Sequence, residues 1–482
     1  MDTTYSGAEV ARRLGTSIPR VVRGAERLGL SCRASNGRLR ISSKMLRQLE
    51  AELGRTPRVP SLTPPQAQVL AALRRAPLGL SSARVVARRA GISPSGASAA
   101  LKALEARGLV RRESKKIAAG RVRRVELLHA NRLAPEWTAL TPYLKDVCPK
   151  ARALRRDKVV PYRLQHLFWN TAPSQLVVSH AGPYIARRLL TSFSYAGLSW
   201  GAENLKASDW RTAAKGRGLD PPTRALALNL AERETGRAKG DPQQSPNARV
   251  PRGGARLEAS ELPEQVARVL PRGTAQAWLV LRKLLPEDLY LIGGTAIAVH
   301  LGHRKSQDLE FIFHEEKVDL VALSKALGKL SDFAVERESP GALRGFLGKA
   351  KVEFFHADED PERTQRILEP PEEVAGLRVA SLKDLAAMKL KALRDRHEMR
   401  DYFDLKQLEE EAEVTVEDAL VFFMERYGVS AEHEAVPQII CCLGFMDDVQ
   451  EDEAQPISKK LLAAWWQRRQ KVLIRGLGIT PP

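Results

Sequence analysis

A glycine turn followed by two acidic residues on one strand constrains this chain more than any other feature of its sequence. Residues 289–292 form a short apolar run, and the Gly-Gly-Thr turn at 293–295 leads into an expected helix. A basic loop follows, and then a strand pattern carries Asp308 and Glu310 two residues apart. Because side chains alternate along a strand, both carboxylates lie on one face. Two acids beside a turn that can cradle phosphate indicate metal-assisted phosphoryl or nucleotidyl transfer.

The length and the cysteines of the chain limit its number of domains and the class of protein to which it can belong. At 482 residues it exceeds what one hydrophobic core serves, so roughly two to four domains are expected. It has no run of about eighteen apolar residues and begins without an apolar signal region, which predicts a cytoplasmic protein with no membrane partner. The cysteines have neither metal-ligand spacing nor a disulfide pattern, and we expect them to be reduced: Cys32, Cys148, Cys441 and Cys442.

The net charge of +20 is unevenly spread. Residues 1–258 hold 47 Lys and Arg against 18 Asp and Glu, which gives +29, whereas the remainder holds 30 against 39, which gives −9. This asymmetry predicts a half that binds nucleic acid joined to a half with another task. It also allows the basic half to bind the acidic half instead of DNA.

The N-terminal half contains two segments with the pattern of DNA-binding helices. In the first, residues 1–55 predict a helix-turn-helix, in which Ser6 caps the first helix and a hairpin follows around Asn36. The second helix carries Arg20 and Arg23, which are candidate DNA contacts.

Residues 60–132 predict a winged helix more clearly. Three helices, expected within 63–76, 81–91 and 93–110, precede two strand-like arms joined by an Ala-Ala-Gly turn. The segment resembles the winged helices of MarR-type regulators. The alternative is that these helices only pack against a partner and that the arginines are solvated. Candidate DNA contacts on the third helix and the basic wing are Ser95, Ser98, Lys102, Arg121, Arg123 and Arg124.

Residues 135–233 carry weaker signals. Helices are expected near 183–192 and 221–233, the second with proline in its first turn. Three tryptophans are interpreted as core anchors and not as a base-stacking platform: Trp169, Trp200 and Trp210. Residues 234–258 are rich in Gly, Pro, Gln and Arg, and they predict a linker between the halves.

From residue 259 the pattern becomes α/β. The expected fold is therefore a multidomain chain, with an α-helical N-terminal half, a mixed-sheet α/β domain at 259–410 and a helical C-terminal domain at 411–482. The expected elements of this half are strands near 289–292, 308–313, 332–337 and 350–355, a helix near 317–330 and a long helix from Ser381.

Nucleotidyl transfer with two divalent cations needs carboxylates that bridge the ions. Asp308 and Glu310 are the expected metal ligands, and Glu353 is the expected third acid, on a neighbouring antiparallel strand. The turn and the basic loop can hold the phosphates of the nucleotide. The candidate nucleotide-binding residues are Gly293, Gly294, Thr295, Arg304, Lys305 and Ser306.

The helix expected from Ser381 adds further candidates. Ser381 and Asp384 predict a capping box. Arg400 could pair with Asp404 or reach phosphate, and Asp401 or Asp404 could act as a base or as an orienting acid. The lysine of this helix is the expected ligand for the β- and γ-phosphates. Helical spacing places four of the side chains on one face: Lys389, Arg396, Arg400 and Asp404.

Each motif alone is weak evidence, because glycine turns, strand acids and helical Arg/Asp pairs are common surface features. Their order within residues 286–410 resembles the AbiE-type toxin nucleotidyltransferases, which are similar to DNA polymerase β. The resemblance implies that Lys389, Asp401 and Asp404 are functional. The chain departs from the family pattern at Glu310 and Glu353, where aspartate is usual.

In that family a separate antitoxin with an N-terminal winged helix represses its own promoter and neutralises the toxin. Residues 1–233 resemble such an antitoxin, here on the same chain as the enzyme. The resemblance implies a contact between the two halves and a neutralising role for residues 135–233. It further implies a toxin–antitoxin or phage-defence protein that uses Mg²⁺ and an NTP to modify an RNA, with tRNA 3′ ends suggested, or a protein.

Two other functions stay open. The chain could be a DNA-binding transcription regulator whose nucleotidyltransferase-like domain only senses nucleotides. The two glutamate departures favour this alternative, whereas intact Asp308, Lys389, Arg400 and Asp404 oppose it. A small-molecule nucleotidyltransferase of the antibiotic-modifying type fits the tandem DNA-binding segments less well.

Overall fold

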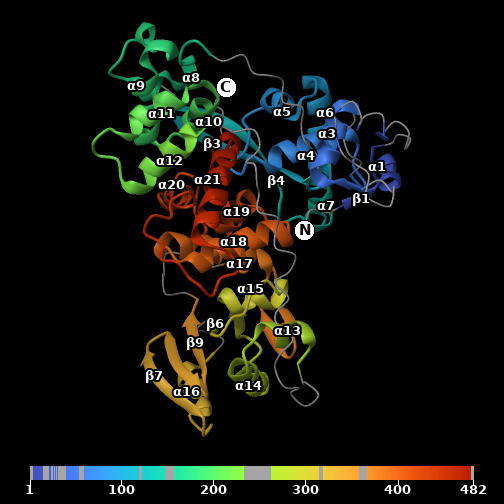
Figure 1. Ribbon diagram of the computed structural model, residues 1–482, viewed down its shortest axis with the longest axis vertical. Coiled ribbons are helices and arrows are strands. Elements are labelled where there is room, and N and C mark those ends of the chain that lie inside the picture. The colour runs from blue at the N-terminus through green and yellow to red at the C-terminus, as the bar shows by residue number, and fades with distance from the viewer. Residues whose placement is uncertain are drawn as a thin grey trace. The chain divides into compact units, whose positions relative to one another are not determined.

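The computed structural model divides the chain into two compact units (Figure 1). One unit comprises Met1–Leu219, Leu230–Gln244 and Lys471–Pro482, and the other comprises Asp220–Asn229 and Ser245–Gln470. The described residues are 4–14, 21–22, 25, 28, 30, 40–53, 59–118, 122–145, 147, 157–232, 262–313, 318–357 and 366–478, so the expected linker at 234–258 lies outside them. Within these ranges no helix has the length and apolar character needed to cross a membrane.

The N-terminal segment of the first unit forms a small core lined by Val10, Leu14 and Ile41. The hairpin turn at Asn36 and the candidate contacts Arg20 and Arg23 lie outside the described residues, as does most of the expected second helix. The described elements of this segment are an antiparallel strand pair, β1 (Thr4–Ser6) and β2 (Arg40–Ser42), and two helices, α1 (Gly7–Arg13) and α3 (Ser43–Leu53).

The expected winged helix is confirmed. Ser82 and Ser93 cap its second and third helices by accepting hydrogen bonds from backbone amides, and Gly91 ends the second helix in the left-handed conformation. The two arms pair in antiparallel register from Val110 opposite Ala130. The elements are α4 (Pro64–Arg74), α5 (Ala83–Ala90), α6 (Pro94–Ala106), β3 (Val110–Ala118), β4 (Val122–Ala130) and α7 (Trp137–Leu144).

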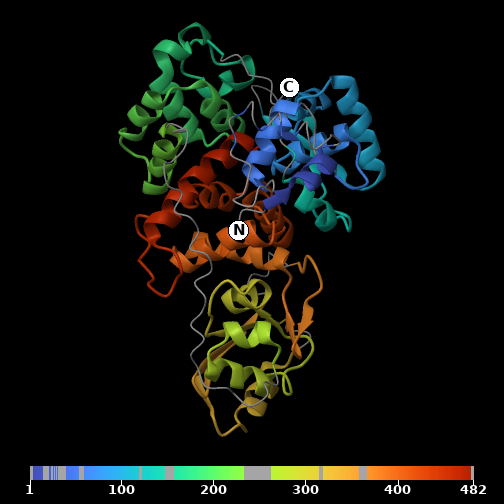
Figure 2. The same ribbon diagram turned by 45° about the vertical axis from the view of Figure 1, so that its right-hand side comes forward.

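The segment that follows is helical, including the two helices expected from the sequence (Figure 2, green). Trp200 and Trp210 are buried, as expected, but Trp169 is 79% exposed, so its interpretation as a core anchor was wrong. The helices are α8 (Tyr162–Gln165), η1 (His166–Phe168), η2 (Pro173–Gln175), α9 (Val178–Ser192), α10 (Tyr195–Asn204), α11 (Ala207–Ala214) and α12 (Pro221–Ala231).

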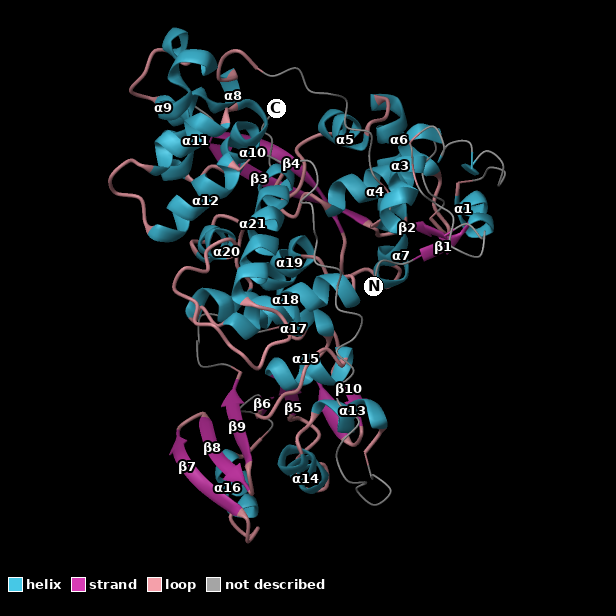
Figure 3. Ribbon diagram, in the orientation of Figure 1, coloured by secondary structure: helices cyan, strands magenta, loops and turns pink. Residues whose placement is uncertain are grey.

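The second unit is built on a seven-stranded mixed sheet in the order β10-β11-β5-β6-β9-β8-β7 (Figure 3). The four expected strands are confirmed as β5, β6, β7 and β9. The pattern did not indicate β8, β10 or β11. The strands are β5 (Tyr290–Ile292), β6 (Leu309–Phe313), β7 (Phe333–Ser339), β8 (Ala342–Leu347), β9 (Ala350–His356), β10 (Glu372–Val374) and β11 (Leu377–Val379).

The strand that carries Glu353 runs parallel to β6, and not antiparallel as the sequence analysis expected. The unrecognised strand β8 explains the error. Because β7, β8 and β9 form an antiparallel meander, the insertion of β8 reverses the direction of β9. Glu353 nevertheless lies directly opposite Glu310 in the register of β6 and β9, so the adjacency of the two acids was predicted correctly.

Helices cover this sheet and extend it into a helical C-terminal part. α15 contacts β5 and β6 and also α17 and α18. Cys441 and Cys442, at the end of α20, are buried free thiols, whereas Cys32 and Cys148 lie outside the described residues. The helices are α13 (Glu264–Val269), α14 (Arg272–Leu281), α15 (Gly293–Leu301), α16 (Leu320–Leu327), α17 (Leu382–Asp395), α18 (Met399–Glu411), α19 (Val416–Tyr427), α20 (Ala435–Cys442) and α21 (Lys459–Gly476).

The long helix expected from Ser381 is two helices. Ser381 caps the helix as expected, because its Oγ accepts from the amide of Asp384 at 3.1 Å. The Asp384 carboxylate accepts from Ser381 Oγ at 2.6 Å, so the reciprocal contact involves the serine side chain in place of the backbone amide that a capping box uses. The helix ends at Asp395, and Arg396 is extended, with φ −149° and ψ 114°. The prediction that Lys389 and Asp404 share one face of a single helix was therefore wrong. The two side chains form an ion pair because the chain turns between α17 and α18 and the two helices pack together.

Candidate active site

The glycine turn and the acidic strand meet at the centre of the sheet. β5 pairs antiparallel with β6, which places Glu310 opposite Ile292, the last residue before the turn. Gly293 has φ +74°, a conformation that favours glycine. A Cβ at this position would also overlap the carboxylate of Glu310. Glycine is therefore required here both by the backbone and by the close approach of the acid.

The other residues of the turn fix the loop that precedes β6. A Cβ at Gly294 would overlap the guanidinium of Arg304, so the second glycine makes room for that arginine. Thr295 Oγ1 donates to Ser306 Oγ at 2.7 Å and also contacts the carbonyl of Asp308. The Thr295 and Ser306 side chains are buried, so they tether the loop to the helix.

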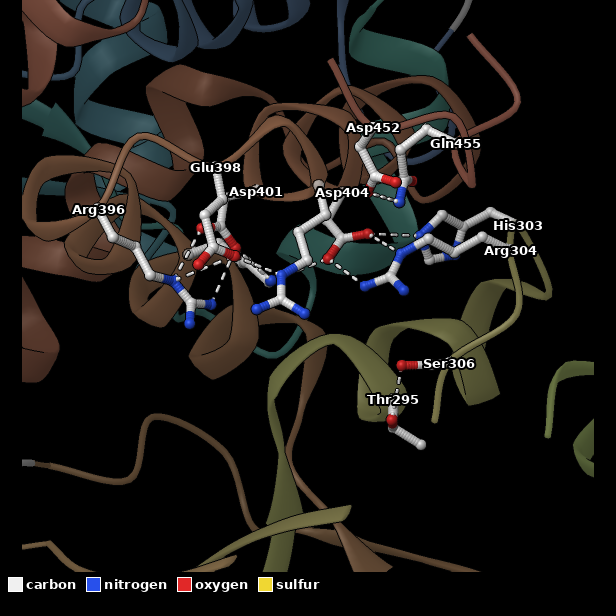
Figure 4. A network of polar contacts seen from close by, with 12 residues as sticks. Thr295, His303, Arg304, Ser306, Arg396, Glu398, Asp401, Asp404, Asp452 and Gln455 are labelled. Atoms are coloured by element: carbon white, nitrogen blue, oxygen red, sulfur yellow. Dashed lines mark hydrogen bonds and ion pairs between the residues drawn. The ribbon is translucent and has the colours of Figure 1, made fainter. Parts of the chain in front are cut away.

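Facing the turn, a group of cations surrounds the carboxylate of Asp404 (Figure 4). His303 Nε2 lies 2.8 Å from its Oδ1, and Arg304 donates through Nε at 2.7 Å to Oδ1 and through Nη2 at 2.9 Å to Oδ2. Lys389 Nζ lies 2.9 Å from Oδ2. Three cationic or potentially cationic side chains thus share one fully buried acid.

Asp401 extends this network along α18. Lys389 Nζ donates to Asp401 Oδ1 at 2.7 Å, and Arg396 Nε donates to Asp401 Oδ2 at 3.1 Å. The side chains of Asp401 and Asp404 are 0% exposed and that of Lys389 is 5% exposed. The turn between α17 and α18 places Arg396 beside Asp401. Lys389, Asp401 and Asp404, which the resemblance implied to be functional, therefore lie in one buried network.

The protonation of this network follows from its pairing. Burial alone would raise the pKa of Asp404, but Lys389, Arg304 and His303 hold it well below its ordinary value. Burial would lower the pKa of Lys389, yet Asp404 and Asp401 raise it. Burial lowers the pKa of His303 despite Asp404. Asp404 is therefore an anion that is fully engaged by donors, and it is a poor proton acceptor.

The acids of the sheet are placed differently. Burial raises the pKa of Glu310, although Lys389 and Arg396 oppose the shift. Glu353 is ion-paired with Arg344 and, at 3.0 Å, with Lys351. Asp308 directly precedes β6, and its half-buried carboxylate makes no hydrogen bond or ion pair with the described residues.

Magnesium is expected from the sequence, and the acids of the sheet are the residues that could hold it. Within the described ranges no group of three or more His, Cys, Asp or Glu side chains is arranged to bind a metal. Mg²⁺, however, commonly takes one or two carboxylates and completes its shell with water and substrate phosphates. Asp308 and Glu310, beside the glycine turn, fit that requirement, whereas the ion pairs of Glu353 make it a weaker candidate.

One expectation about the basic side chains needs revision. Arg400 pairs with Glu398, and the arginine that binds Asp404 is Arg304, which is distant in sequence. Lys305 is exposed. The sequence pattern did not indicate His303 as a site residue. Its only signal was its position next to Arg304 in the basic loop, since the partner of both residues is on another helix.

The candidate DNA contacts are described in part. Ser95, Ser98 and Lys102 are exposed on α6 with the spacing of one helical face, and Arg124 is exposed on β4. Arg121 and the side chain of Arg123 lie outside what is described. In the same wing, Arg112 is bound to Glu105 at 2.8 Å and to Glu126 at 3.0 Å, which reduces the positive charge that it offers to a phosphate.

Comparisons with known families define the class of each part. Residues 279–477 match the family described as nucleotidyl transferase AbiEii toxin, type IV TA system. Residues 61–116 match the MarR family. The chain therefore joins an N-terminal MarR-family winged-helix domain to a C-terminal AbiEii nucleotidyltransferase toxin domain.

Individual relatives cover only part of the chain. The uncharacterized protein aq_aa25 of Aquifex aeolicus (strain VF5) is 36% identical over 121 residues, which is 24% of this chain and 56% of that protein. JHP933 from Helicobacter pylori matches at 20% identity with a TM-score of 0.27, covering 44% of this chain and 93% of its own. A putative nucleotidyltransferase from H. pylori matches at 20% identity with a TM-score of 0.28, covering 44% and 96%.

Proposed function

We propose that the second unit transfers a nucleotidyl group from an NTP to an RNA or protein acceptor, and that the winged helix binds DNA at the promoter of its own gene. The observation that carries this proposal is the carboxylate of Asp308, which has no polar partner among the described residues and lies next to Glu310 and the glycine turn. Such an arrangement supplies anionic ligands beside backbone amides that can hold phosphate. The AbiEii domain supports the same class of reaction.

In this reaction the oxygen of an acceptor hydroxyl forms a bond to the α-phosphorus of the NTP. The bond from that phosphorus to the bridging oxygen breaks, and pyrophosphate leaves. The hydroxyl proton passes to solvent water, because Asp404, whose pKa is held low, is a poor proton acceptor and Glu310 is a metal ligand in this proposal. Mg²⁺, held by Asp308 and Glu310, would supply neutralisation of the phosphate charge.

The helical network has an orienting role in this proposal. Asp404 holds Arg304 against Gly294, and it is ion-paired with Lys389. The amides of Gly293, Gly294 and Thr295, together with Arg304, Lys305 and Ser306, form the expected phosphate-binding group. Lys389 engages two aspartates, which leaves one of its three N–H donors for the β- and γ-phosphates.

The proposal is tested by incubating the full chain with each labelled NTP, Mg²⁺ and total cellular RNA. Label in RNA supports transfer to RNA, and label in protein supports the other acceptor. For the DNA-binding half, reversal of charge at Arg121, Arg123 and Arg124 should weaken binding to promoter DNA and flatten its dependence on salt. Unchanged binding would place the DNA surface elsewhere.

A second function is favoured by one observation. Glu353 is neutralised by Arg344 and Lys351, so a third free acid is not in place beside Glu310. A domain that only senses nucleotides, and so regulates DNA binding, would need no third acid. Binding of NTP without transfer to RNA or to protein, together with a change in promoter affinity, would establish this alternative.

A further inference from the structure

Two large aromatic side chains are presented to solvent in the segment between the winged helix and the enzyme. Tyr162 is 82% exposed and Trp169 is 79% exposed. Tyr162 begins α8, and Trp169 directly follows η1, seven residues later in the chain. Leu164 and Phe168, which lie between them, are buried.

The chain around Trp169 is held in place from both sides by α9. Arg188 Nε donates to the carbonyl of Leu167 at 2.6 Å. One turn earlier in α9, the Tyr184 hydroxyl donates to Asn170 Oδ1 at 2.9 Å and lies 2.7 Å from Thr171 Oγ1. The residues before and after the tryptophan are therefore fixed, while its own ring stays in solvent.

The ring also has a cation beside it. The guanidinium carbon of Arg188 lies 5.8 Å from the centroid of the Trp169 ring, a cation–π distance. The hydrogen bond to Leu167 restrains this guanidinium, so the indole and the positive charge are arranged before any partner binds. Such preorganisation lowers the entropic cost of association.

The charge of the segment indicates what the partner is. Residues 157–219 contain eight Lys and Arg against three Asp and Glu. An exposed aromatic side chain with a neighbouring arginine and a positive surrounding is the combination by which proteins bind unpaired nucleotides, since the bases stack on the ring and the phosphates meet the cations. Paired bases of a duplex do not present their faces for such stacking.

We propose that Tyr162 and Trp169, with Arg188, form a platform that binds single-stranded RNA. The choice of RNA rests on the proposed function, in which an RNA is the acceptor of the nucleotide. The platform would engage an unpaired segment of that RNA outside the active site. This proposal gives an RNA-binding role to residues 135–233, for which the resemblance implied only neutralisation of the toxin.

The test is fluorescence anisotropy with a labelled single-stranded RNA of mixed sequence, measured on the full chain without NTP. Trp169→Ala should raise Kd about tenfold, which corresponds to about 1.4 kcal/mol. Trp169→Phe, which keeps an aromatic face, should retain most of the affinity. Tyr162→Ala should weaken binding in the same direction by a smaller factor.

Two controls separate the platform from other causes. Val472→Ala removes apolar surface from another exposed residue of the same unit and should leave Kd unchanged. Promoter duplex should bind the Trp169→Ala variant as it binds the wild type. Equal RNA affinity of Trp169→Ala and the wild type overturns the proposal, and capture of a protein by this surface with no RNA effect overturns it too. Because NTP is absent, a failure of nucleotidyl transfer leaves this result intact.

Discussion

The two sides of the candidate active site differ in how their charges are compensated. On the helical side, Asp401 and Asp404 are fully buried, and Lys389, Arg304 and Arg396 bind them at hydrogen-bonding distance. On the sheet side, the carboxylate of Asp308 makes no hydrogen bond or ion pair within the described part of the chain, and Glu310 is buried with a raised pKa. The acids of the helical side are compensated without a ligand, whereas those of the sheet side are short of positive charge.

This difference indicates separate roles for two pairs of acids that the sequence alone does not distinguish, Asp401 and Asp404 on the helices and Asp308 and Glu310 on the sheet. A carboxylate that already accepts several charged hydrogen bonds has little capacity left for a metal ion, and it contributes to the rigidity of the site. A carboxylate that lacks partners gains most from a cation and from the charge that arrives with a nucleotide. The predictions below change one side at a time, from the largest expected effect to the smallest.

Removing the central acid of the helical side should have the largest effect. Asp404→Ala leaves Lys389 and Arg304 buried without their shared partner, and it should lower the free energy of unfolding by about 3–5 kcal/mol. Urea unfolding of the full chain measures the loss. A change below about 1 kcal/mol would show that the network is not structural.

Removing the free acid of the sheet side should affect activity and not stability. Asp308→Ala should reduce nucleotidyl transfer at least about 100-fold, because metal assistance contributes several kcal/mol to such reactions. Its unfolding midpoint should match that of the wild type. Glu373→Ala, which removes an exposed acid on β10, is the matched control for both measurements. Full activity of Asp308→Ala would exclude this residue as a metal ligand.

The histidine of the network offers a conservative test. His303→Leu removes a donor to buried Asp404 and should cost about 1.5–3 kcal/mol of stability, the range for hydrogen bonds to charged groups. His303→Gln carries an amide nitrogen that can replace Nε2, so it should recover most of that loss. Equal thermal stability of the two variants would contradict a hydrogen-bonding role for His303.

Neutralising Glu310 should have the smallest effect on stability, and its sign should be opposite. Folding raises the pKa of this acid, so the folded chain holds its proton more tightly than the unfolded chain does. The free energy of unfolding therefore falls as the pH rises from the ordinary glutamate pKa through the raised value. Glu310→Gln removes that loss, so it should increase stability at pH 7.

The pH profile of Asp404 distinguishes the two sides further. Its pKa is lowered on folding, so its contribution to stability is present above the ordinary aspartate pKa and is lost as the pH falls through the lowered value. Unfolding measured from pH 3 to pH 8 should give opposite slopes for the effects of Glu310→Gln and Asp404→Asn. Parallel slopes would show that the two sides are not compensated differently.

Much of this arrangement followed from local patterns in the sequence. The turn at Gly293, the strand that follows it and the cap at Ser381 all depend on residues close together in the chain. The helix break at 396–398 was not predictable in this way, because no Gly or Pro marks it. It is accompanied by ion pairs of Arg396 and of His397, the latter with Asp448, which is distant in sequence.

Other features depended on contacts between distant segments. The pairing of Arg304 with Asp404, and the direction of β9, required the whole sheet and its covering helices. The exposure of Trp169 accompanies hydrogen bonds from α9 to the residues on either side of it. The spacing of apolar residues in the sequence does not indicate these bonds. The predicted domain boundaries stay predictions, although the two compact units interleave along the chain at Asp220–Asn229 and after Gln470.

The most direct test of the account is whether Mg²⁺ binding depends on the sheet side alone. Calorimetry should measure the affinity of the full chain for a non-hydrolysable NTP analogue, with and without Mg²⁺, in the wild type and in Asp308→Asn. We predict that Mg²⁺ tightens binding in the wild type and that Asp308→Asn abolishes this effect while it keeps the affinity measured without metal. The same enhancement by Mg²⁺ in both proteins would contradict the assignment of the metal to Asp308.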